Sequence, residues 1–183
     1  MKATGIVRRI DDLGRVVVPK EIRRTLGIRE GTPLEIFTGQ EGEVVLKKYS
    51  PLGEIHTFAQ NYAESLAQAS GMLSCITDME RVIGASGAGR KEVAEQEISE
   101  EFVRLLEERK ATVISCEERS GAKFLKGKKV DYREILVCPV LAGGDVIGSV
   151  LFVRQEREKG VSGEICQKLA RCAAAFLGSQ MEP

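Results

Sequence analysis

The stretch GIVRRIDDLGRVVVPKEIRRTLGI, residues 5–28, decides the fold of the first part of this chain. Two aliphatic runs in it, residues 5–11 and 14–18, are joined by the sequence DDLG, in which Gly14 can adopt the positive φ of a tight turn. We therefore predict two strands over these runs, connected as a hairpin.

A short helix and a second hairpin are predicted after the first one. Pro19 suits the start of a helix, the sequence KEIRRTL (20–26) forms its body, and Gly27 ends it. Residues 33–39 and 43–49 indicate two more strands around a glycine-containing turn. The N-terminal segment is therefore predicted to have the order β-β-α-β-β.

This N-terminal segment is small for a self-sufficient domain. About 50 residues bury barely enough surface to fold alone, and natural domains of this size often depend on disulfides, a metal or a second chain. The segment contains no cysteine and no histidine, so neither disulfides nor the usual zinc ligands are available to it. We therefore expect an obligate, intertwined dimer of two copies.

Charge is distributed unevenly along the sequence. The whole chain carries 27 basic and 27 acidic side chains, and its formal net charge is zero. Residues 1–29, however, hold eight basic and three acidic side chains, a net charge of +5, which leaves −5 for the remainder. This asymmetry is typical of a module that binds nucleic acid or another anion, attached to an acidic domain. The alternative interpretation is a solvated surface of salt bridges.

The arginines of this segment are the candidate DNA-contacting residues. A hairpin and a short helix bring them together, and a two-fold dimer doubles the set. Their planar guanidinium groups bind phosphates or guanine edges and stay charged at any relevant pH. Arg9 is included because of its charge and its adjacency to Arg8. The full set is Arg8, Arg9, Arg15, Arg23 and Arg24.

The pattern R-x-I-D-x-L-G-R-V-V-[IV]-P-x-E-[IL]-R is present in full over residues 8–23. On this pattern, residues 1–52 resemble the swapped-hairpin DNA-binding domain of the AbrB-type transition-state regulators. The resemblance implies an intertwined β-barrel dimer that binds double-stranded DNA. The arginines that face DNA in that family match Arg8, Arg15, Arg23 and Arg24.

The second part of the chain is predicted to be a separate α+β domain. Ser50, Pro51 and Gly53 interrupt the pattern, so we predict domains at 1–52 and 53–183. Periodicity then predicts an antiparallel sheet covered by helices, in the order α-β-β-α-β-β-β-α, and not an alternating parallel fold. The predicted helices cover residues 54–70, 99–109 and 163–178, and the predicted strands lie within 73–86, 111–115, 133–143 and 145–155.

Together with this second segment, the chain resembles members of the family that carry a C-terminal GAF-like sensor domain. The resemblance implies a sequence-specific transcription regulator that activates and represses sporulation genes, with a small-molecule effector for the GAF-like domain. Antitoxins share the swapped-hairpin dimer, but their second segment is a disordered tail that wraps a toxin. Residues 53–183 are apolar and periodic, which is typical of a globular domain and argues against an antitoxin.

The glycine-rich stretch GASGAGRKE (84–92) is the candidate ligand-binding segment of the second domain. A phosphate loop requires the pattern G-x-x-x-x-G-K-[ST], and here Gly89 is followed by Arg-Lys-Glu, without a hydroxyl for magnesium. Under the GAF resemblance the stretch covers a small-molecule pocket, with Ser86 and Arg90 as polar contacts. The alternatives are a plain connection at a sheet edge and a nucleotide-binding sensor or enzyme centred on this loop.

The sequence gives no support for an enzyme or a metalloprotein. Its five cysteines are scattered, which indicates reduced and mostly buried thiols, and His56 is its only histidine. We therefore predict no catalytic residue, no metal and no cofactor. No apolar run is long enough to cross a membrane, so we expect a cytoplasmic protein.

The flanking helices predict a further level of assembly. The N-terminal segment pairs with one partner chain, while the amphipathic helices at about 54–70 and 163–178 offer the second domain a pairing surface of its own. If the two surfaces choose different partners, two-fold contacts close into a homotetramer.

Overall fold

A computed structural model of the chain divides into two compact units, Met1–Tyr49 and Ser50–Pro183. The structure describes residues 5–40, 42–49, 56–115, 124–127, 130, 132–155 and 161–181. The predicted domain boundary between residues 52 and 53 lies outside these ranges.

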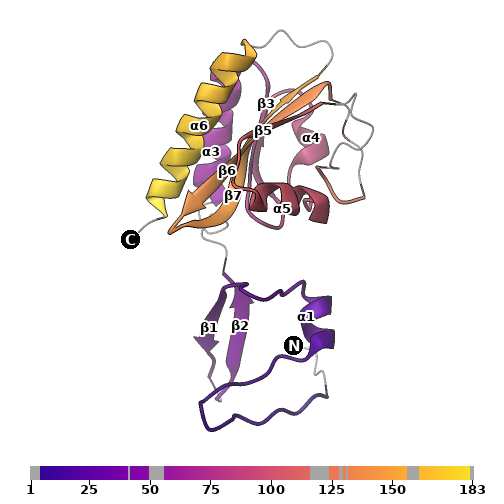
Figure 1. Cartoon of the computed structure of the whole chain (residues 1–183), viewed down its shortest axis with the longest axis vertical. Coiled ribbons are helices and arrows are strands. Elements are labelled where there is room, and N and C mark those ends of the chain that lie inside the picture. Colours follow the sequence, from indigo (N-terminus) through magenta and orange to yellow (C-terminus); the bar gives the residue numbers. More distant parts are fainter. Residues whose placement is uncertain are drawn as a thin grey trace. The chain divides into compact units, whose positions relative to one another are not determined.

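The described residues of the N-terminal unit form one helix and one antiparallel hairpin, as predicted for residues 20–49 (Figure 1). Helix α1 spans Lys20–Thr25, and strands β1 (Leu34–Thr38) and β2 (Val44–Lys48) pair so that Leu34 lies opposite Lys48. Gly27 follows the C-cap residue Leu26, as predicted for the end of this helix; its N–H donates to the carbonyl oxygen of Arg24, and its φ of +63° turns the following chain away from the helix.

The predicted strands over residues 5–11 and 14–18 are wrong for the single chain, in which neither run belongs to a sheet. A strand needs neighbours for its backbone N–H and C=O groups, and the backbone–backbone bonds between these two runs close only the turn from Asp11 to Arg15 in the described part of the chain. The apolar side chains of these runs are exposed, to 84% at Val7 and 69% at Val17. Pro19 is the only buried residue among those described in this unit.

The second unit is built on a five-stranded antiparallel sheet with the strand order β4-β3-β7-β6-β5. This agrees with the prediction of an antiparallel rather than a parallel sheet. The long central pair β6–β7 has a tight turn at Gly143 and Gly144, which both have positive φ. The strands are β3 (Leu73–Thr77), β4 (Val82–Ser86), β5 (Thr112–Ser115), β6 (Glu134–Ala142) and β7 (Asp145–Arg154).

Helices cover both faces of this sheet (Figure 1). Helices α3 (His56–Ser70) and α6 (Gly163–Gln180) pack on one face, in a core that includes Phe152 and Leu177. Helix α5 (Glu100–Glu107) contributes Phe102 to the core on the other face. The four-residue helix α4 (Arg90–Val93) was not predicted, because its sequence is too short to show a periodicity.

Helix α3 lies unusually close to the edge strand β4. The side-chain amide of Gln60 donates to the carbonyl oxygen of Ala85 at 3.0 Å and accepts from the N–H of the same residue at 3.1 Å. It therefore takes the place that a neighbouring strand would occupy along β4, and covers backbone groups that would otherwise be unpaired. The close approach is possible because residue 84 is glycine.

Gly84→Ala is expected to lower the free energy of unfolding by about 1–3 kcal/mol, the usual cost of overpacking a core. A Cβ at this position would lie 2.5 Å from the carbonyl oxygen of Ala59, so α3 would have to shift. The control is Gly163→Ala, because Gly163 has no positive φ and nothing within 4 Å of its Cβ position. Urea unfolding of both variants checks this, and equal midpoints would contradict it.

Candidate nucleic-acid interface

The five candidate arginines lie on two elements of the N-terminal unit. Arg8 and Arg9 precede the turn at residues 11–14, and Arg15 follows it, so these three flank one tight turn, which we call the basic hairpin although its two arms are not strands in the single chain. Arg23 and Arg24 lie in the last turn of α1. All five side chains are exposed, and none forms an ion pair with a described residue.

The hairpin turn is closed by hydrogen bonds that centre on Asp11. Its backbone N–H donates to the carbonyl oxygen of Arg15 at 3.0 Å, and its own carbonyl oxygen accepts from Gly14 at 3.0 Å. Gly14 has a φ of +75°, which fits the three-residue hairpin loop that ends in a glycine bulge. The sequence prediction of a turn at DDLG is confirmed, although the roles of the individual residues within it were not anticipated.

The end of α1 also places its arginines through backbone bonds. The N–H of Ile28 donates to the carbonyl oxygen of Arg23 at 2.8 Å, which together with the Gly27 bond closes the helix in a Schellman motif. Positive side chains are favoured at this end, because the helix dipole is negative there. The guanidinium groups project from a helix in which no residue is buried.

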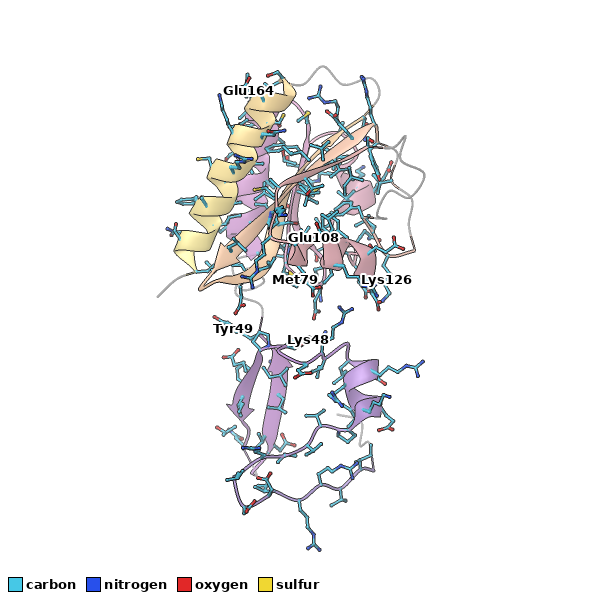
Figure 2. The ribbon with its side chains drawn as sticks, in the orientation of Figure 1. Lys48, Tyr49, Met79, Glu108, Lys126 and Glu164 are labelled. Carbon is cyan, nitrogen blue, oxygen red and sulfur yellow. The ribbon has the colours of Figure 1, made fainter. Side chains whose placement is uncertain are left out.

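Figure 2 draws the side chains of this unit projecting from the ribbon, and many large apolar ones among them are exposed. A single copy therefore presents both the arginines and an uncovered apolar surface. The exposed large apolar residues are Ile6, Val7, Ile10, Leu13, Val16, Val17, Leu26, Ile36, Phe37, Val44, Leu46 and Tyr49.

The glycine-rich stretch of the second unit does not have the form of a phosphate loop. Gly84 is buried within β4, and its role is the close packing against α3. Ser86 is the half-buried last residue of β4, and Arg90 is the exposed first residue of α4. The helix that follows has four residues, so it offers little of the dipole that a phosphate loop uses.

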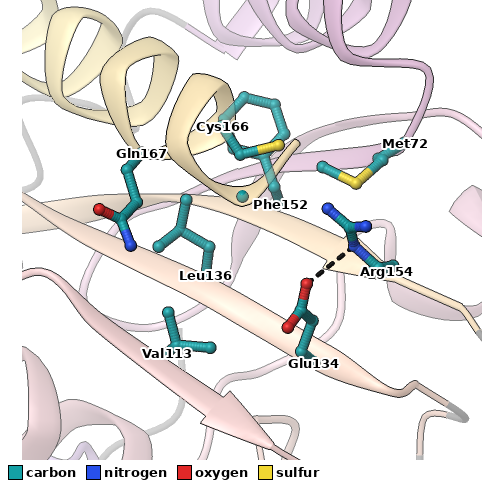
Figure 3. Close-up of a pocket in the computed structure, with 9 residues that line it drawn as sticks. Met72, Val113, Glu134, Leu136, Phe152, Arg154, Cys166 and Gln167 are labelled. Carbon is teal, nitrogen blue, oxygen red and sulfur yellow. Dashed lines mark ion pairs between the residues drawn. The ribbon is translucent and has the colours of Figure 1, made fainter. Parts of the chain in front are cut away.

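A cavity of about 150 Å³ lies elsewhere in this unit, between the start of α6 and the sheet (Figure 3). The Nε of Arg154 lies 2.8 Å from Oε1 of Glu134 at its edge, and Nη2 of Arg154 donates to the carbonyl oxygen of Val161 at 2.9 Å. Ser86 and Arg90 do not line it. Sequence reasoning missed this cavity because its lining comes from distant segments: Met72, Val113, Glu134, Leu136, Phe152, Arg154, Gly163, Cys166 and Gln167.

Three of the predicted buried thiols are indeed buried, namely Cys75, Cys138 and Cys166. Burial raises the pKa of the Cys75 thiol to about 12, which makes it unreactive at neutral pH. Cys172 is exposed on α6, contrary to the general expectation, and Cys116 lies outside the described residues. The described residues contain no cluster suited to a metal ion, and no described helix is long and apolar enough to cross a membrane.

An apolar surface runs along the outer sides of α3 and α6, and we name it the helix-face cluster. The rings of Phe58 and Tyr62 stack with centroids 5.7 Å apart, and Phe176 lies 5.6 Å from Tyr62. Phe58 and Phe176 are 39% and 42% exposed. The cluster consists of Phe58, Tyr62, Ile165, Leu169, Cys172 and Phe176.

Two family models match this chain. One, described as stage V sporulation protein T C-terminal, transcription factor, matches residues 54–182. The other, described as antidote-toxin recognition MazE, bacterial antitoxin, matches residues 7–53.

Individual relatives agree with this division. Stage V sporulation protein T of Bacillus subtilis strain 168 is 45% identical over 182 residues, which cover 100% of this chain and 99% of the relative. Transition state regulatory protein AbrB of the same organism is 48% identical over 73 residues, which cover 40% of this chain and 75% of that protein.

Among solved structures, the GAF domain of an Acinetobacter phosphoenolpyruvate-protein phosphotransferase matches with a TM-score of 0.56 at 16% identity, and covers 69% of this chain and 81% of that one. The GAF-like fold predicted for the second unit is thereby confirmed. With a full-length relative at 45% identity and a family model that matches most of its residues, this chain belongs to the stage V sporulation protein T family of transcription factors.

Proposed function

We propose that this chain is a sequence-specific DNA-binding regulator that activates and represses sporulation genes. The observation that carries the proposal is the set of exposed arginines without ion-pair partners among the described residues, on a unit that resembles AbrB in sequence. Arg8, Arg9, Arg15, Arg23 and Arg24 are its DNA-contacting residues. Their charges are available to phosphates without first breaking a salt bridge in the described part of the chain.

The DNA-binding form is an intertwined dimer of N-terminal units. Residues 5–11 and 14–18 carry β-branched side chains, and in the single chain neither run belongs to a sheet with partner strands. A second copy supplies partner strands for the backbone groups of these runs and also covers their exposed apolar side chains. The dimer also doubles the set of arginines.

The second unit pairs through the helix-face cluster, which makes the full chain a tetramer. Its apolar residues on α6, Ile165, Leu169, Cys172 and Phe176, recur at spacings of four, three and four. This spacing is typical of a helix that buries one side against a partner helix and another against its own core. If the two units choose different partner chains, the assembly closes with four copies.

The GAF-like unit is proposed as a sensor that modulates DNA binding through a small molecule. Ser86 and Arg90 remain our proposed polar contacts, because both belong to the one segment in which β4 turns into α4. The nucleotide alternative is tested by the same chain with labelled ATP and GTP. Retention of either nucleotide by the wild-type chain but not by Arg90→Ala would support the alternative.

Selection of DNA from a random-sequence pool tests the proposed function directly. The full-length chain is incubated with duplexes of about 40 base pairs, which span several helical turns. Enrichment of a defined sequence after repeated rounds is the expected result. Retention of all duplexes alike would show non-specific binding, and retention of none would refute the proposed function.

A further inference from the structure

Two aspartates interrupt the basic hairpin at the point where DNA contact is proposed. Asp11 and Asp12 lie between Arg9 and Arg15, and both are exposed. A carboxylate within about 8 Å of a phosphate backbone is repelled by it at physiological salt. Simple electrostatics therefore predicts that removal of either aspartate strengthens DNA binding.

The contacts of the two aspartates are very different. Oδ1 of Asp11 accepts hydrogen bonds from the N–H of Leu13 at 3.0 Å and from the N–H of Arg15 at 2.7 Å. The backbone of Asp11 adds the bond to the carbonyl oxygen of Arg15 at 3.0 Å. Asp12 forms no side-chain hydrogen bond or ion pair with a described residue.

We propose that Asp11 is a positioning residue for DNA binding, which acts through Arg15. Its carboxylate and its own N–H together hold the N–H and C=O of Arg15, so both backbone groups of that arginine are fixed. The direction in which the arginine side chain leaves the hairpin is set before DNA arrives. The inference rests on the proposed function and assigns a role to a residue that carries the opposite charge to the rest of the interface.

The physical reason is preorganisation. Bonds from backbone N–H groups to a carboxylate are charge-assisted and stronger than neutral ones. Without them the turn samples other conformations, and ordering it again on DNA weakens binding. Part of the negative charge of Asp11 is also balanced by the two N–H dipoles that point at it, whereas the charge of Asp12 is not balanced in this way.

The two aspartates are therefore expected to respond in opposite directions. The probe is the duplex enriched by the wild-type full-length chain, titrated with each variant. Asp11→Ala should weaken binding about tenfold, although it removes a negative charge. Asp12→Ala, the matched control, should leave the affinity unchanged or raise it up to about threefold. Asp11→Asn should stay within about threefold of wild type, because its amide oxygen can accept the same two bonds.

A double-mutant cycle separates positioning from a merely structural role. In an Arg15→Ala background, the additional weakening caused by Asp11→Ala should shrink to less than about threefold, because the side chain that it positions is gone. An undiminished effect in that background, or binding by Asp11→Ala equal to wild type, would overturn the inference while leaving the proposed function intact. Failure of the wild-type chain to enrich any duplex would refute both. Thermal unfolding confirms that each variant is folded.

Discussion

Arg15→Ala and Arg23→Ala are each expected to weaken DNA binding by about tenfold to a hundredfold. Both guanidinium groups are exposed and have no ion-pair partner among the described residues, so each can release counterions from the phosphate backbone. The weakening should be similar across DNA sequences. The slope of log affinity against log salt should fall by about 1 for each phosphate that the variant no longer binds.

The matched control is Arg104→Ala, which removes an exposed arginine from helix α5 of the second unit. It changes the net charge of the chain by the same amount, so it corrects for any general electrostatic effect. Affinity and salt slope are measured by fluorescence anisotropy at several salt concentrations. If Arg15→Ala leaves the slope unchanged and abolishes the preference at only one operator base, that arginine reads a base edge and not the backbone.

In the tetramer that we propose for the full-length chain, Phe176→Asp is expected to separate the four copies into dimers. The phenylalanine belongs to the aromatic part of the helix-face cluster, and its ring centroid lies 5.6 Å from that of Tyr62 and 6.2 Å from that of Phe58. Two-fold pairing would bring the introduced carboxylates into an apolar interface, where an unpaired charge is strongly unfavourable. Affinity for a single DNA site should be retained, while affinity for paired sites should fall by about a hundredfold because the two DNA-binding dimers are no longer linked.

Light scattering measures the mass, and titration of DNA with one or two sites measures the linkage. The control is Arg171→Asp, which places an aspartate on α6 at an exposed residue that does not belong to the cluster. The reaction rate of Cys172 is an independent measure of assembly. Its thiol is exposed in the single chain, so it should react slowly with a thiol reagent in the tetramer and quickly in Phe176→Asp. A tetramer that persists in Phe176→Asp would place the second pairing surface elsewhere.

Local sequence signals predicted most of the elements of the fold. The helix after Pro19 and the β1–β2 hairpin are where proline, glycine and strand patterns placed them, because their hydrogen bonds are formed between near neighbours. The strands of the second unit and helix α6 were also predicted from local patterns, although the sheet pairs residues as distant as Leu73 and Val153. Helix α4 escaped prediction because four residues contain too little periodicity.

The candidate site was predicted in part. Charge and the hairpin pattern identified the arginines, and the structure shows them exposed, while their contact with DNA remains a proposal. The same pattern could have pointed to Asp11, since an aspartate three residues before a turn glycine often bonds to the backbone. The negative charge of Asp11 argued against it, because a DNA-binding surface is expected to consist of basic residues.

The sequence by itself determined the two-part organisation, the excess of positive charge in the first part and the elements whose bonds are local. Only the tertiary structure decided that Gly84 is a packing residue, since its role depends on Ala59 in another element. The same is true of the cavity beside Arg154 and of the helix-face cluster, which join residues far apart in the chain. Periodicity reports which side of an element is apolar, whereas which surfaces meet is fixed by long-range packing.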